Sequence, residues 1–153
     1  MYGIEIKDAR QGVLTVHLRD ILGAIADQVA GWDWSLLHLW AVGDLPGTKT
    51  VVDYEKLAAH SPATGARLDA AEVERLAEHA DQIIDAVIVG NANPREVGKA
   101  YADGGVYRDN DLVIEANDST GWRVVSKRAE LIDALRRRFA DVTEVQDFES
   151  MGD

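Results

Sequence analysis

Apolar and polar residues alternate, or recur at helical spacing, over most of the chain, and these patterns predict its elements. Residues 2–7 alternate, which predicts a short strand. Residues 17–30 place five aliphatic side chains on one stripe, so we expect an amphipathic helix that stops near Gly31. Residues 34–42 are apolar at both alternating sets of positions, which indicates a strand covered on both faces.

The strand expected at 34–42 contains a histidine between tryptophans. Alternate residues of a strand share a face, so Trp34, His38 and Trp40 are expected on the same side. The histidine could act as a general base or stack in a pocket, and a semi-buried core histidine is the alternative. Trp32, in the loop before the strand, could pack in the core or anchor an interface. We therefore take Trp34, His38 and Trp40 as a possible ligand pocket.

The middle of the chain predicts two helices and a strand. Residues 53–59 could form a short helix that ends before the following Ser-Pro pair, because a residue preceding proline is disfavoured in a helix. Asp69 followed by Glu72 matches a capping box, so a helix is expected over 69–80. Residues 82–89 could continue that helix or form a strand, and their β-branched composition favours the strand.

The C-terminal part contains the clearest local unit, a β-hairpin. Residues 112–116 and 122–126 resemble strands, and the five residues between them are turn formers that end in glycine. Before it, an Asn-Pro-Arg-Glu sequence predicts a short helix over 93–101, stopped by two glycines. After it, residues 127–139 predict a helix, and residues 142–148 alternate weakly as an edge strand would.

These elements indicate an α+β fold with a mostly antiparallel sheet and helices packed on one face, because the hairpin requires antiparallel pairing. The chain has 153 residues, a normal size for a single domain over 1–153, with 146–153 as a frayed tail. It contains no cysteine, which excludes disulfides and thiol chemistry. The charged N-terminus does not fit a signal peptide, and no apolar run is long enough to span a membrane, so we expect a bacterial cytoplasmic protein.

The net charge of −11 is unevenly distributed. Residues 121–140 hold six basic and two acidic side chains, whereas residues 141–153 hold five acidic ones and no basic one. An acidic protein repels nucleic acids and anionic membranes and attracts cationic partners, although high acidity also serves solubility alone. The basic triplet at 136–138 suits the negative end of a helix dipole, or pairing with the acidic tail.

An acidic cluster surrounds the predicted hairpin and comprises Asp109, Asp111, Glu115 and Asp118. A calcium loop would need a ligand where Val113 stands, followed by a glycine, so no metal site is expected. Asp111 and Glu115 could in principle form an acid/base pair. The glycine-rich nucleotide motifs and the serine-hydrolase motif are absent, and the four histidines lack zinc spacing, so no cofactor and no catalytic residue is predicted.

Three stretches between Asp81 and Val142 carry a resemblance to a known group of proteins. They are DQIID, LVIEANDSTGWRVVS and LIDALRRRFADV. In this order of strand, acidic hairpin and closing helix, the segment resembles the C-terminal half of small bacterial polymorphic-toxin immunity proteins. The resemblance implies stoichiometric binding and inhibition of a cognate toxin, for which a basic nuclease domain would be a suitable partner.

The sequence therefore predicts a non-catalytic immunity or inhibitor protein whose partner is a basic toxin domain. A small enzyme or ligand-binding domain with a pocket near Trp34, His38 and Trp40 is one alternative, and a structural subunit of a larger assembly is another. The oligomeric state is left open. The expected partner-binding residues are the acidic side chains of the hairpin and of the 69–80 helix, with Trp32 as a possible anchor: Asp109, Asp111, Glu115, Asp118, Trp32, Glu72, Glu74 and Glu78.

Overall fold

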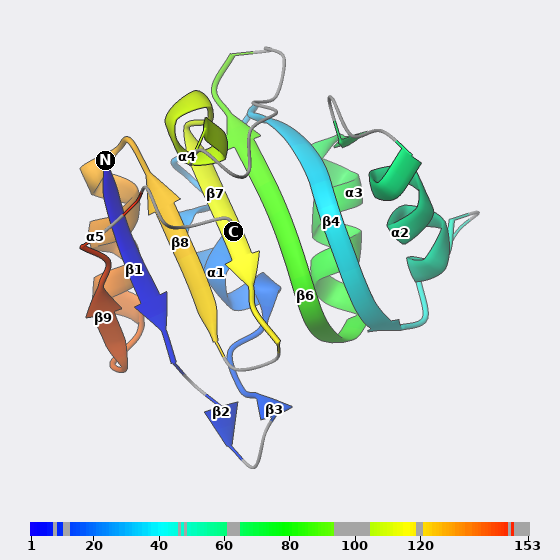
Figure 1. The fold of residues 1–153 in the computed structure, drawn as a ribbon, viewed down its shortest axis with the longest axis horizontal. Helices are drawn as coiled ribbons and strands as arrows, with labels where there is room; N and C mark the ends of the chain where they lie inside the picture. The colour runs from blue at the N-terminus through cyan, green and yellow to red at the C-terminus, as the bar shows by residue number, and fades with distance from the viewer. Residues whose placement is uncertain are drawn as a thin grey trace.

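A seven-stranded antiparallel sheet forms the centre of the molecule (Figure 1). The computed structural model describes residues 1–7, 9–10, 13–45, 47, 49–60, 65–93, 105–118, 121–146 and 148. The strands of the sheet are β1 (Tyr2–Ile6), β4 (Asp33–Gly43), β5 (Ala66–Leu68), β6 (Ala80–Asn91), β7 (Leu112–Ala116), β8 (Trp122–Ser126) and β9 (Val142–Glu144). Their order is β5-β4-β6-β7-β8-β1-β9, and each neighbouring pair is antiparallel. A separate small ribbon is formed by β2 (Ala9–Arg10) and β3 (Val13–Leu14).

Five helices are described, and most of them cover one face of the sheet. They are α1 (Leu18–Ile25), α2 (Val51–His60), α3 (Ala70–His79), α4 (Gly105–Asp109) and α5 (Ala129–Arg138). Figure 1 shows α1 and α3 behind the sheet, and their buried side chains, with those of α5, join its main hydrophobic core. The short α4 packs on the opposite face. This arrangement confirms the expected α+β class. None of the helices in the described ranges has the length and apolarity to cross a membrane.

Most of the expected elements are present. The two hairpin strands match β7 and β8, and the ambiguous residues 82–89 belong to the strand β6. Asp69 caps α3 as expected, because its carboxylate accepts the Glu72 amide at 2.8 Å while Glu72 Oε1 accepts the Asp69 amide at 3.4 Å. The helix expected over 17–30 is shorter, since α1 ends at Ile25 and turns follow. The helix expected over 93–101 falls almost entirely outside the described residues.

The two faces of the sheet have different covers. The main core lies between the sheet and the layer of α1, α3 and α5. On the other face, which we call the front face because Figure 1 is viewed from it, α4 and the segment after β9 cover a smaller apolar cluster. Phe148 lies there against Gly3 of β1. The buried side chains of this second cluster are Val89, Val106, Tyr107, Val113 and Val125.

A β-bulge in β4 shifts its pairing with β6. Leu36 pairs with Ile88, but His38 pairs with Val87, so β4 uses two residues where β6 uses one. The additional residue is Leu37, which packs partly buried against the front-face cluster. A bulge of this kind changes which alternate side chains point to each face of the strand.

The bulge makes the expectation of one shared aromatic face wrong. Trp34 precedes it and lies in the main core, where it is 5% exposed. Beyond the bulge Leu39 occupies the core side, and His38 and Trp40 are exposed on the front face. The expectation assumed unbroken alternation, and one added residue reverses the pattern.

Candidate functional site

A row of five side chains crosses the front face from β4 to β1. His38 is in register with Val87, Val87 with Glu115, Glu115 with Arg123, and Arg123 with Glu5. Residues in register on neighbouring strands place their side chains side by side on the same face. The row therefore brings together polar groups from four strands, of which only β7 and β8 are neighbours in the sequence.

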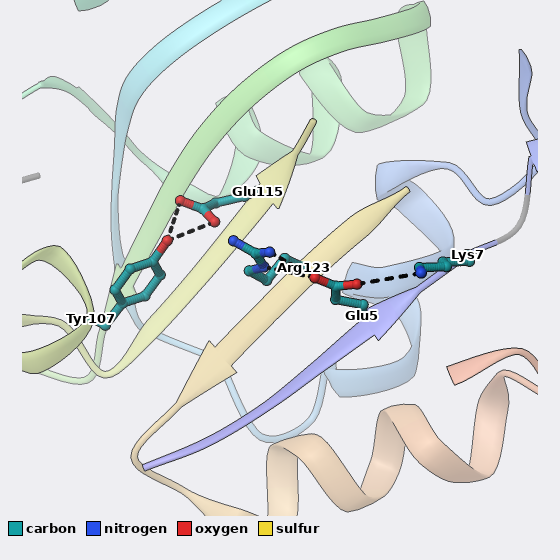
Figure 2. A network of polar contacts seen from close by, with 5 residues as sticks. All are labelled: Glu5, Lys7, Tyr107, Glu115 and Arg123. Carbon is teal, nitrogen blue, oxygen red and sulfur yellow. Dashed lines mark hydrogen bonds and ion pairs between the residues drawn. The ribbon is translucent and has the colours of Figure 1, made fainter. Parts of the chain in front are cut away.

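Three members of the row, Glu115, Arg123 and Glu5, form a polar network with Tyr107 and Lys7 (Figure 2). The guanidinium of Arg123 donates to Glu5 Oε1 from Nη2 at 2.7 Å and from Nε at 3.3 Å. The Tyr107 hydroxyl, from α4, lies 2.7 and 2.8 Å from the two carboxylate oxygens of Glu115 and donates to them. Lys7 extends the network at its outer end, with Nζ 3.9 Å from Glu5 Oε2.

Burial controls the electrostatics of this network. Burial raises the pKa of Glu115 above its ordinary value, although the Tyr107 hydrogen bond and the Arg123 charge both act to lower it. Burial and the Glu115 charge raise the pKa of Tyr107 far above the physiological range, so its hydroxyl remains a donor. For Arg123, burial acts to lower the pKa, but the hydrogen bond and charge of Glu5, together with the charges of Glu115 and Tyr107, raise it overall.

The network fastens elements together. Glu115 accepts a hydrogen bond from Tyr107, which joins α4 to β7. Arg123 donates to Glu5, which joins β8 to β1. The remaining titratable group of the row, His38, is separated from Glu115 by the strand that carries Val87. Two strand spacings amount to roughly 9.5 Å, so this pair does not form a histidine–carboxylate hydrogen bond. The geometry supports a structural role for the network.

A second group of side chains on the front face is open to solvent. Trp40 is 53% exposed and Val42 is 56% exposed. Trp40 is in register with Asp85 of β6, and Asp85 Oδ1 accepts the amide of Asp118 from the β7–β8 loop at 2.7 Å. We call Trp40, Val42, Asp85 and Asp118 the Trp40 patch. It combines an exposed apolar surface with two carboxylates.

The possible pocket at Trp34, His38 and Trp40 is not formed, because the bulge places Trp34 on the opposite face from the other two. A hollow does lie elsewhere, between the start of α1 and the start of β6, where it is lined by Leu18, Ile83 and Trp122 among others. Its empty volume of about 290 Å³ includes open solvent. The expected interface anchor Trp32 is only 8% exposed, and the Arg128 guanidinium lies 4.9 Å from its ring centre.

The four carboxylates of the acidic cluster around the hairpin lie in different environments. Asp111 is buried and structural: its Oδ2 accepts the Ala92 amide at 2.9 Å, and its own amide donates to Asn91. Glu115 is half-buried and accepts from the Tyr107 hydroxyl, so these two carboxylates have different hydrogen-bond partners. Asp109 and Asp118 are exposed. Of these four carboxylates, Asp118 alone is part of the Trp40 patch.

The acidic side chains of α3 lie on the other side of the sheet from the hairpin group, because α3 belongs to the helix layer behind it (Figure 1). Glu74 and Glu78 are exposed there. Glu72 is half-buried, and it accepts a hydrogen bond from the Tyr54 hydroxyl at 3.0 Å. The two acidic groups that the sequence suggested for one partner therefore belong to different surfaces.

The basic triplet on α5 pairs partly with the acidic C-terminal region. Arg136 donates from Nε and Nη2 to the two carboxylate oxygens of Glu144, both at 2.7 Å. This hydrogen bonding lowers the pKa of Glu144. The pair fastens the edge strand β9 to α5, so the expected pairing with the acidic C-terminal region is confirmed for Arg136.

Sequence reasoning missed Tyr107, Arg123 and Asp85. The Glu115–Arg123 pair has a detectable signal, because matching the ends of the predicted hairpin strands places these residues opposite each other. Nothing local indicates that Tyr107 reaches Glu115 or that Asp85 lies beside Trp40.

In the described part of the chain no cluster of three or more histidine and carboxylate side chains could hold a metal ion. Comparison with protein-family models, with characterised proteins and with solved structures found no match to this chain.

Proposed function

We propose that this chain is a non-catalytic binding protein of the immunity type, which captures a cationic protein partner on the front face of its sheet. The observation that carries the proposal is the Trp40 patch: an indole that is 53% exposed and in register with a carboxylate, on a protein of net charge −11. The resemblance of residues 81–142 to immunity proteins motivates the choice of a toxin as partner.

The composition of the patch suits protein recognition. Tryptophan is enriched among the residues that dominate interface energies, and truncating such a residue commonly costs about 2 kcal/mol or more. Trp40 and Val42 supply the apolar contact, while Asp85 and Asp118 supply charge beside it. Surrounding charge acts mainly on the association rate and the choice of partner, and salt weakens it.

The titratable side chains of the neighbouring polar network already bind one another, which favours binding over catalysis at this face. Its titratable groups are engaged with one another, since Tyr107 occupies Glu115 and Arg123 bridges toward Glu5. The network holds β7, β8 and β1 in place beside the patch. A rigid platform lowers the entropy cost that binding would otherwise incur.

Co-expression with the product of the adjacent gene tests the proposal. We expect that product to arrest growth when expressed alone, and this chain to restore growth and to form a 1:1 complex with it. Trp40→Ala should weaken the complex by about tenfold or more. Glu74→Gln is the matched control, because it removes one charge from the far side of the molecule and should leave protection unchanged. A neighbour that is harmless, or that does not bind, overturns the proposal.

A further inference from the structure

We infer that Trp40 and Asp85 together form a subsite for one arginine side chain of the partner. This inference rests on the proposed function and specifies the chemistry of its central contact. The occupant is a guanidinium that lies over the Trp40 indole and donates to the Asp85 carboxylate.

The register of β4 and β6 brings the two groups within reach of one ligand. Trp40 and Asp85 are directly paired, at the edge of a second register shift between Trp40 and Ala41, and paired residues of neighbouring strands place their side chains side by side on the same face. A cation over an aromatic ring interacts favourably within about 6 Å of the ring centre. A planar guanidinium stacked on Trp40 can therefore reach the neighbouring carboxylate with its edge.

The Asp85 carboxylate is held in a defined position. Its Oδ1 accepts the Asp118 amide at 2.7 Å, and the backbone of Asp118 has a positive φ of 49°. Within the described residues, Oδ2 of Asp85 has no hydrogen-bond partner. This oxygen is an acceptor available to a ligand, and the exposed Asp118 carboxylate adds negative charge beside it.

A comparison with Trp32 within the same molecule shows what such a subsite looks like when it is filled. Over the ring of Trp32 lies the Arg128 guanidinium, at 4.9 Å from the ring centre. Trp40 has no such cation over its ring among the described residues. The chain thus supplies its own arginine to one tryptophan and leaves the other, next to a carboxylate, without one.

Two alternatives fit less well. Lysine carries a compact, strongly hydrated charge, whereas the flat guanidinium stacks on an indole and presents several donors to a carboxylate. A second copy of this chain would bring Asp85 and Asp118 toward another acidic molecule, and like charges oppose that contact.

A titration of the full chain with a hexa-arginine amide peptide tests the subsite. The readout is the chemical shift of the Trp40 indole N–H, assigned by its loss in Trp40→Phe. Saturable shifts of this signal are expected, and binding should be roughly fivefold to tenfold weaker for Trp40→Ala. Hexa-lysine amide should bind several-fold more weakly than the arginine peptide, and hexa-citrulline, its neutral analogue, should not bind.

Charge variants separate a defined subsite from diffuse attraction. Asp85→Asn keeps an oxygen for the Asp118 amide but loses the charge, and it should weaken binding at low salt. Glu74→Gln, which removes the same charge from the opposite side, should have no comparable effect. Equal losses in the two variants, undiminished binding by Trp40→Ala, or no shift at millimolar peptide would overturn the inference. Sedimentation as a dimer that Trp40→Ala dissolves would also overturn it.

The two proposals fail separately. If the peptide does not bind but the adjacent gene product still does, the partner is recognised by other chemistry and only the arginine subsite is lost. If the peptide binds at Trp40 and the adjacent gene product does not, the immunity role is lost and the subsite remains.

Discussion

The Tyr107 hydroxyl donates to the Glu115 carboxylate from a position within 2.8 Å of both oxygens. This contact is a polar link between α4 and the sheet, and the buried side chains of Val106 and Tyr107 add apolar packing on the front face. The ring of Tyr107 is almost completely buried at 1% exposure. Helix and strand are thus joined by a buried aromatic ring that ends in a charge-assisted hydrogen bond.

Tyr107→Phe removes this hydrogen bond while keeping the ring. We expect the free energy of unfolding to fall by about 1.5–3 kcal/mol, the range for hydrogen bonds to charged groups. The pKa of Glu115 should rise further, because the lost hydrogen bond acts to lower it. Urea denaturation measures the first effect, and a pH titration followed by NMR measures the second. An unchanged Glu115 pKa in the variant would contradict the assigned hydrogen bond.

The raised pKa of Glu115 predicts a particular pH dependence of stability. Burial raises the pKa in the folded state above the ordinary value of 4.5, so the folded protein binds this proton more tightly than the unfolded chain. The contribution of Glu115 to the free energy of unfolding therefore decreases as the pH rises from about 4.5 through the folded-state pKa. Glu115→Gln should remove this slope. Denaturation across this range measures the free energy of unfolding of the wild type minus that of the variant. This difference should fall as the pH rises, and a difference that increases with pH would show that the sign is wrong.

The exposures of the tryptophans predict different roles for Trp40 and Trp122. Trp40→Phe changes an exposed side chain, so stability should change by no more than about 0.5 kcal/mol, while the iodide-quenchable part of the fluorescence disappears. Trp122→Phe is the matched change in the core. It removes the indole N–H that donates to the Val16 carbonyl at 2.8 Å, and it should cost about 1–3 kcal/mol. Quenching that persists unchanged in Trp40→Phe would contradict the exposed position of this residue.

Two glycines predict opposite effects of the same substitution. Gly23 lies in α1 with nothing within 4 Å of an added Cβ, so Gly23→Ala should stabilise the protein by about 0.5–1 kcal/mol. At Gly90 an added Cβ would lie 2.9 Å from the Trp34 ring, which is packed over it. Gly90→Ala should therefore destabilise the protein by about 1–3 kcal/mol through overpacking. Thermal unfolding of both variants checks the pair, and equal shifts in the same direction would refute it.

Local patterns were sufficient to predict the elements whose causes are local. The capping box at Asp69 and Glu72 and the hairpin between β7 and β8 are set by residues within a few positions of each other. The same hairpin register even predicts the Glu115–Arg123 pair. The start of α4 is different, because Gly105 resembles a helix terminator in the sequence but is the buried first residue of a helix that packs on the sheet.

The candidate site could not be predicted from the sequence because its geometry is set by pairing between distant strands. The exposure of Trp40 depends on how β4 pairs with β6, some forty residues further along the chain. The neighbour Asp85 and the contact of Asp118 with it come from the same long-range arrangement. When both faces of a strand are apolar, the alternation of residue types does not reveal a bulge, because an extra residue leaves the pattern unchanged.

The bulge at Leu37 has a consequence for chain length. A deletion of one residue inside a strand normally moves every side chain beyond it to the opposite face, because successive side chains point to alternate faces. At position 37 the extra residue is already accommodated outside the regular ladder, between the pairs made by Leu36 and His38. A relative that lacks only this residue would keep Leu39 inward and Trp40 outward. A one-residue gap at this position in an alignment would therefore preserve both the core and the aromatic surface.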